Sequence, residues 1–143
     1  WKAMEVKGDH ALIAIWPEDG DLHKGGRVTA NKLLWALGNY SFFVRPGYVR
    51  IACDGADDLN ALTVSAYMSP EGDRLVLVGV NSGFRDEDIS LRLPSSVRRR
   101  VSAVKTYRTD SRTDLALVGS SERVPSSITA RQRSLTTIVI DLQ

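Results

Sequence analysis

The chain has 143 residues, with 19 Lys and Arg side chains against 17 Asp and Glu side chains, so its formal net charge is +2. This balance gives no support from charge for binding to nucleic acid or to a membrane surface. A hydrophobic share of 43% and a charged share of 25% are typical of a globular domain and exclude a disordered chain. Its one cysteine, Cys53, excludes an internal disulfide and a zinc site built on cysteines.

The first elements are a short strand, a loop and a helix. Residues 10–16 form a continuous apolar run and predict a buried strand. Residues 17–26 hold proline, glycines and acids without periodicity, and predict a loop. Thr29 is the expected N-cap of a helix, which must end before the Arg-Pro-Gly at 45–47. The apolar positions of this helix recur at helical spacing and include Leu33, Leu37 and Tyr40.

Beyond residue 47 the apolar period changes to two. The segment 75–80 is apolar on both faces, which predicts a central strand. About eight short strands, with turn signals roughly every ten residues, are typical of a β-sandwich. The expected strands are 48–53, 62–68, 75–80, 89–93, 101–107, 115–118, 127–130 and 135–142.

The segment 34–51 includes Gly38-Asn39-Tyr40-Ser41 and Arg45-Pro46-Gly47. It resembles the stretch of glycoside hydrolase family 30 in which the last barrel helix enters a side β-sandwich, and three further segments share the resemblance. The other segments resemble the family's central sandwich strand ending in Asn, its Tyr-Arg-Thr strand end and its closing strand. They are 75–81, 106–109 and 133–140.

The resemblance implies a mainly β fold, an antiparallel β-sandwich preceded by the last β/α unit of a (β/α)8 barrel. Residues 1–46 would be the last strand, loop and helix of the barrel, and residues 47–143 the sandwich. The chain starts at Trp1 with no signal segment before it, so we expect either that a segment has been removed or that the chain is a piece of a longer product.

The resemblance also implies a retaining β-glycosidase, which needs an acid/base carboxyl and a nucleophile carboxylate about 5–5.5 Å apart. The two family glutamates lie on barrel strands four and seven, outside these residues, so the chain alone is expected to be inactive. The intact enzyme would be secreted and would cleave a polysaccharide. The sequence of residues 35–51 resembles the β-1,6-galactan-cleaving branch of the family, so this substrate is favoured, with xylan and β-1,6-glucan left open. Neither a cofactor nor a metal is expected, and neither nucleic acid nor a membrane is an expected partner.

Three residues are predicted to contact the sugar. Trp1 falls where the family has a tryptophan at the end of barrel strand eight, so the resemblance makes it an aromatic floor under the substrate. Trp16 and His23 belong to the strand end and acid-rich loop that follow, and barrel enzymes build their sites from such loops. A core tryptophan and a solvated loop are the alternative interpretations.

Other clusters give weaker hypotheses. Asp19, Asp21 and His23 alternate as metal ligands do, but the remaining oxygens of an EF-hand are absent. Glu5 and Glu18 have nothing that fixes their separation as a catalytic pair. The basic residues Arg98, Arg99, Arg100, Lys105 and Arg108 suit either an anionic sugar or a solvated edge. Asn39-Tyr40-Ser41 is a glycosylation sequon inside the helix, and Cys53 is expected to be a small buried side chain.

Two functions of other classes compete with the glycosidase. A carbohydrate-binding module would present two or three aromatic rings on one sheet, whereas residues 49–143 offer Tyr67, Phe84 and Tyr107 at wide spacing. A purely structural sandwich that holds the last helix in place is the default for residues 47–143. Residues 1–46 are expected to be poorly stable without partner structure, which would pack against Leu33, Leu37 and Tyr40.

Overall fold

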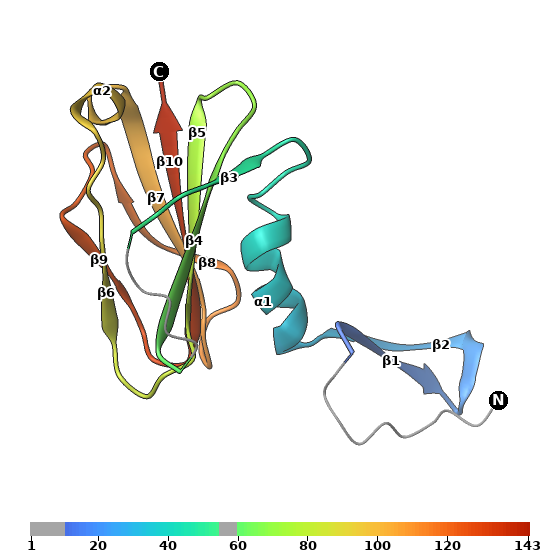
Figure 1. Ribbon diagram of the computed structural model, residues 1–143. Helices are drawn as coiled ribbons and strands as arrows, with labels where there is room; N and C mark the ends of the chain where they lie inside the picture. The colour runs from blue at the N-terminus through green and yellow to red at the C-terminus, as the bar shows by residue number, and fades with distance from the viewer. Residues whose placement is uncertain (1–10, 55–59) are drawn as a thin grey trace.

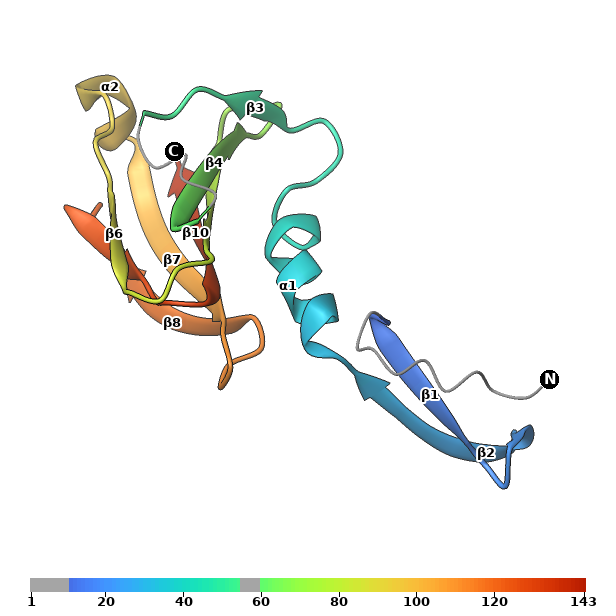
Figure 2. The same ribbon diagram turned by 60° about the horizontal axis from the view of Figure 1, so that its bottom comes forward.

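The computed structural model describes residues 11–54 and 60–143, and Trp1 and Glu5 lie outside them. The described part is mainly β, with antiparallel sheets, as the sequence predicts. A six-stranded sheet has a two-stranded sheet on one side and the helix α1 (Lys32–Ser41) on the other (Figure 1). A hairpin precedes α1 and projects away from these layers in both ribbon views (Figure 2).

The six-stranded sheet has the order β3-β4-β5-β10-β7-β8, and the small sheet pairs β6 with β9. Their positions agree closely with the expected strands. The large sheet contains β3 (Val49–Ile51), β4 (Leu62–Met68), β5 (Arg74–Asn81), β10 (Ser134–Leu142), β7 (Val101–Thr109) and β8 (Ala116–Ser121). The small sheet contains β6 (Glu87–Ser90) and β9 (Ser127–Ala130), and a short helix, α2 (Ser95–Arg98), precedes β7.

The central strands are apolar on both sides because both faces of the large sheet are covered. Leu77 of β5 and Ile138 of β10 belong to the main core, which Ile89 of β6 also joins. Val78 and Val139 face the other way and pack with Phe43, just beyond the end of α1. Strand β5 lies between β4 and β10, so its prediction as a central strand is confirmed.

The prediction of a loop at 17–26 is wrong, because most of these residues belong to a β-hairpin. β1 (Ile13–Glu18) and β2 (Asp21–Ala30) pair antiparallel across a two-residue turn. Thr29 therefore lies in β2 and does not cap the helix. The N-cap position is Asn31, whose backbone N–H bonds to the Leu12 carbonyl and whose side chain bonds to the Ala11 carbonyl.

Gly26 makes the hairpin possible. It has φ +147°, and a Cβ added there would lie 2.3 Å from the carbonyl oxygen of Trp16 on the facing strand. A residue with a side chain cannot occupy that position without moving the backbone. One of the glycines that made 17–26 resemble a loop, Gly26, is thus what lets β2 approach β1.

Candidate functional site

The hairpin has two different faces. Side chains directly opposite in an antiparallel pair share a face, so the register pairs Ile15 with Val28 on one side and Trp16 with Arg27 on the other. Ile15 and Val28 are both exposed within the part of the chain that the structure describes. The first face is therefore suited to packing against protein, and the second carries the candidate residue Trp16.

Trp16 is 55% exposed on the hairpin. A flat ring held on a strand and open to solvent can stack on the C–H face of a pyranose. Arg27, its register partner, supplies planar N–H donors beside it. Trp1, the other predicted stacking residue, falls outside the described residues, so its stacking role stays a prediction.

His23 lies beyond the Pro17–Gly26 pair, toward the tip of the same hairpin. Its side chain is exposed, and its backbone N–H donates to Asp21 Oδ1 at 2.9 Å. Asp19 is paired instead with Lys24, at 3.9 Å. Among the described residues no three His, Cys, Asp or Glu side chains come together as a metal site. The hairpin thus carries both Trp16 and His23, and its described side chains form no metal-binding group around them.

A buried polar network joins α1 to the sheet, and we call Asn39, Thr109 and Thr137 the helix–sandwich joint. Asn39 is 0% exposed, and its Nδ2 donates to Trp35 O at 2.8 Å and to Thr109 Oγ1 at 2.7 Å. Thr137 Oγ1 lies 3.0 Å from both Asn39 O and Asn39 Oδ1. The buried polar groups of these three residues thus satisfy one another's hydrogen-bonding capacity, which fixes one position of the helix on the sheet.

The structure gives a packing role to a residue in each of the four segments that resemble glycoside hydrolase family 30. Asn39, Thr109 and Thr137 each come from a different one of them. Asn81, from the fourth, donates to Arg85 O and Ala130 O and accepts from the Gly83 N–H, so it holds the turn after β5 against β9. These residues position elements and do not form a reactive site. Burial of Asn39 also excludes its use as a glycosylation site.

Tyr40 was expected to face partner structure, and this is wrong. Its hydroxyl lies 3.2 Å from Ser65 Oγ, and its ring packs edge-on to Tyr67 with the centroids 6.3 Å apart. Leu33 and Leu37 precede Tyr40 on the same apolar stripe of α1, but they are 44% and 49% exposed. The helix therefore docks on the sandwich through Tyr40 and leaves the two leucines open.

The sandwich aromatics do not form a sugar-binding face. Tyr67 packs on Tyr40, and Tyr107 packs on Phe43 with the ring centroids 4.5 Å apart. Phe84 is 79% exposed, but it stands beside Arg133 on the turn after β5, apart from the other two. The placement of these rings argues against an independent carbohydrate-binding module.

The basic residues predicted as one cluster are separated. Arg100 bonds to the Gly72 and Gln143 carbonyls beyond α2, at the start of β7. Lys105 pairs with Asp141 at 3.6 Å. Arg108 lies near the far end of β7 and reaches Thr129 of β9. Cys53 also differs from expectation, because it is exposed and donates weakly to Val64 O at 3.5 Å.

The fold is that of a β-sandwich found in polysaccharide hydrolases. No protein-family model matches the chain. Among solved structures, a conserved exported protein from Bacteroides fragilis is 28% identical with a TM-score of 0.72, covering 90% of this chain and 26% of that one. A family 30 endoxylanase from Clostridium papyrosolvens is 29% identical with a TM-score of 0.65, covering 79% and 28%. These similarities support a fold like that of glycoside hydrolase family 30.

A more distant structure shares the fold alone. A β-porphyranase of glycoside hydrolase family 86 from Bacteroides plebeius is 15% identical with a TM-score of 0.65, covering 90% of this chain and 22% of that one. The chain thus spans about a quarter of the length of the structures it matches. Neither described helix is long and apolar enough to cross a membrane.

Proposed function

We propose that the chain is the C-terminal part of a secreted, retaining β-glycosidase that acts on a polysaccharide. Residues 1–46 would be the last strand, loop and helix of a (β/α)8 barrel, and residues 47–143 its side sandwich. The observation that carries the proposal is the 29% identity to a family 30 endoxylanase across 79% of the chain. β-1,6-Galactan is the favoured substrate, with xylan and β-1,6-glucan as alternatives. The exported relative supports secretion.

The distribution of exposed apolar side chains supports the proposed barrel partner. Most of the large exposed hydrophobic residues in the described chain fall between residues 12 and 42, on the hairpin and the open side of α1. A surface of this kind marks a site of packing against other protein. In the proposal, the face of Ile15 and Val28, together with Leu33 and Leu37, packs against the rest of the barrel.

The residues of the chain then have defined roles in the longer enzyme. Trp1 and Trp16 would stack on sugar rings, and His23 would hydrogen-bond to a sugar hydroxyl. The carboxyl groups that perform acid/base and nucleophilic catalysis come from upstream barrel strands. The sandwich holds α1, and hence the base of the hairpin, through the helix–sandwich joint.

An activity assay on two proteins tests this. The pure 143-residue chain should release no reducing sugar from β-1,6-galactan, glucuronoxylan or β-1,6-glucan, whereas the longer protein should hydrolyse one of them with retention. Turnover by the 143-residue chain that a substitution within it abolishes, or inversion by the longer protein, would refute the proposal.

Variants of the longer enzyme test the stacking residues. Trp1→Ala and Trp16→Ala should each lower kcat/KM by about tenfold or more with little change in Tm, because stacking acts on the substrate. Phe84→Ala is the matched control, since it removes an exposed ring on the turn after β5, outside the hairpin, and should leave activity unchanged. A core role for Trp1 would show the opposite pattern, with near-normal turnover and a loss of about 3–5 kcal/mol in stability.

A further inference from the structure

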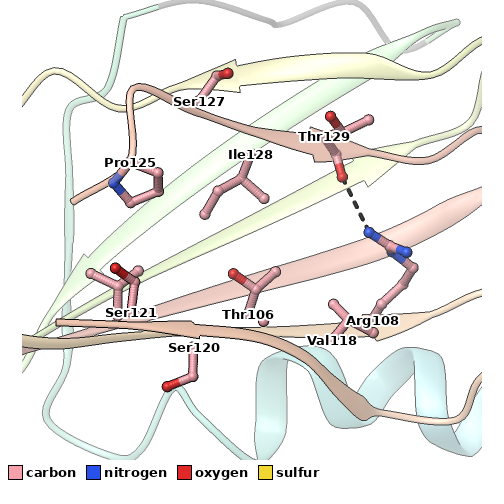
Figure 3. Close-up of a pocket in the computed structure, with 11 residues that line it drawn as sticks. Thr106, Arg108, Val118, Ser120, Ser121, Pro125, Ser127, Ile128 and Thr129 are labelled. Carbon is pink, nitrogen blue, oxygen red and sulfur yellow. Dashed lines mark hydrogen bonds between the residues drawn. The ribbon is translucent and has the colours of Figure 1, made fainter. Parts of the chain in front are cut away.

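A hollow of about 290 Å³ opens between the large and small sheets, where β8 and β9 are the edge strands (Figure 3). Val104, Thr106 and Arg108 of β7 line it from one side, and Ile128 and Thr129 of β9 line it from the other. Its volume is near the lower end of the ~300–1,000 Å³ range of small-molecule sites. Val104 also belongs to the core between the sheets, so the hollow lies on the face of the large sheet away from α1.

Arg108 has unused hydrogen-bonding capacity in this hollow. Its Nη2 donates to Thr129 O at 3.4 Å, near the limit of a hydrogen bond. Its Nε is buried and has no partner among the residues that the structure describes. A buried donor without a partner costs about 1–3 kcal/mol, and more when it is charged. A ligand that accepts from Nε would recover this free energy.

The charge around the hollow is one-sided. None of the described residues that line it is acidic. Asp110 follows Arg108 closely in the chain and interacts with its positive charge, but its Oδ1 accepts from the backbone N–H groups of Arg112 and Thr113. Asp88 accepts from the Thr129 hydroxyl. Among the described residues that line the hollow, the guanidinium therefore has no carboxylate partner.

We infer that this hollow binds a carboxylate-bearing small molecule, with Arg108 as the residue that pairs with the carboxylate. The planar guanidinium presents Nε and Nη donors in a fork that matches the two oxygens of a carboxylate. No aromatic ring lines the hollow, so recognition depends on charge and on hydroxyl groups such as that of Thr106. The inference does not depend on the proposed glycosidase activity.

Gly119 provides a way to close the hollow without touching the arginine. It is the register partner of Thr106, and a Cβ built on it points toward the Thr106 side chain, 3.7 Å from its Cβ. Gly119 is not among the glycines with positive φ, so its backbone conformation accepts a residue with a side chain. Gly119→Val therefore fills the space beside Arg108 and leaves the guanidinium in place.

The test is a titration of the full chain, with the Arg108 Nε–H signal and the Gly119 amide followed by ¹⁵N NMR at constant ionic strength. Sodium acetate, sodium glucuronate and glucose are the three probes. We expect saturable shifts with acetate and glucuronate and none with glucose. Tighter binding of glucuronate than of acetate by tenfold would identify an acidic sugar as the better ligand, and equal binding would identify a free carboxylate.

The variants decide whether the hollow is the site. Arg108→Gln and Gly119→Val should each weaken carboxylate binding at least tenfold while the remaining amide spectrum stays native. Arg99→Gln, which changes an exposed arginine on the other end of the sandwich, should bind as the unmodified chain does. The inference is overturned if neither carboxylate gives a saturable shift, if sodium chloride gives the same shift, or if Gly119→Val binds normally.

Discussion

Asn39 shows how one side chain can determine the position of a helix. It is a polar residue with no exposed surface, yet all of its side-chain hydrogen-bonding atoms have partners on three elements. Buried polar groups that are fully paired specify one arrangement, because any shift leaves some of them without a partner. The presence of Asn39 in the helix motif is therefore explained by its structural role in fixing the helix on the sheet.

Asn39→Ala should destabilise the chain by about 2–3 kcal/mol, because it leaves the Thr109 and Thr137 hydroxyls buried with fewer partners. The measurement is urea unfolding followed by circular dichroism. Ser41→Ala is the control, since Ser41 is exposed on the same helix and its hydroxyl donates to the Leu37 carbonyl. Equal midpoints for the two variants would show that the joint contributes little.

Asp110 gives a pH dependence with a defined sign. Burial raises the pKa of its carboxyl, but hydrogen bonds from the backbone N–H groups of Arg112 and Thr113, together with the positive charge of Arg108, outweigh this and hold the pKa below its ordinary value. A carboxyl with a lowered folded-state pKa stabilises the fold above its unfolded-state pKa, and this contribution disappears as the pH falls through the folded-state pKa.

Asp110→Ala should therefore lower stability by about 1 kcal/mol at pH 7, and the difference from the unmodified chain should shrink in acid. Urea midpoints measured at several pH values between neutral and strongly acidic conditions will show this. Asp110→Asn keeps an acceptor oxygen without the charge, so it should lose less. A deficit that grows as the pH falls would contradict the assignment.

At the scale of elements, the hairpin depends on the close approach of its strands at Gly26. Gly26→Ala should disrupt the pairing of β1 with β2, because the new Cβ overlaps the Trp16 carbonyl. Loss of the cross-strand contact between Ile15 and Val28 in NMR spectra will measure it. Gly20→Ala tests the alternative that any turn glycine is equally sensitive, since Gly20 also has positive φ but open space around it. The hairpin should survive that change better.

The sandwich could be predicted from sequence and the hairpin could not, for a physical reason. Strands such as 75–80 and 135–142 have apolar runs that reflect burial on both faces, so their pattern reports their place in the sheet. Residues 21–30 become a strand only because β1 lies opposite, and their two glycines mask this. Tyr40 was misassigned because helical spacing identifies an apolar face but not which neighbour covers it.

The candidate site was only partly accessible to the same reasoning. Trp16 and His23 could be singled out by residue type and by their place after a strand, and the structure puts both on one hairpin. Arg108 was noticed as one of several basic residues, but its unpaired Nε depends on the side of β7 that it faces. The alternation Val104, Thr106, Arg108 indicates this face once the neighbouring core residue is known.

At the scale of the whole molecule, stability should be uneven. The sandwich and α1 share two packed clusters, whereas the hairpin has extensive contacts only between its own strands in the described chain. Segments with few buried apolar contacts open at low free energy. The expectation that residues 1–46 need partner structure is wrong for α1, because this helix is docked on the sandwich. Among the described residues, the expectation still applies to the hairpin.

Hydrogen exchange of the isolated chain will test this. Amides of α1 near Asn39 should exchange about as slowly as those of β5 and β10, and amides of β1 and β2 should exchange much faster. In the longer enzyme of the proposal, the hairpin amides should become protected. Slow exchange in the hairpin of the isolated chain would mean that its exposed faces are covered in solution.

The short link between hairpin and helix has a consequence for how such chains diversify. Asn31 alone separates β2 from α1, and it closes the base of the hairpin through the Leu12 and Ala11 carbonyls. Whatever lies between residues 12 and 31 can be exchanged for a segment of another length or composition while that base and the helix–sandwich joint are retained. In the proposed glycosidase, where the hairpin contacts the sugar, substrate preference could therefore change through this segment while the supporting helix and sandwich stay the same.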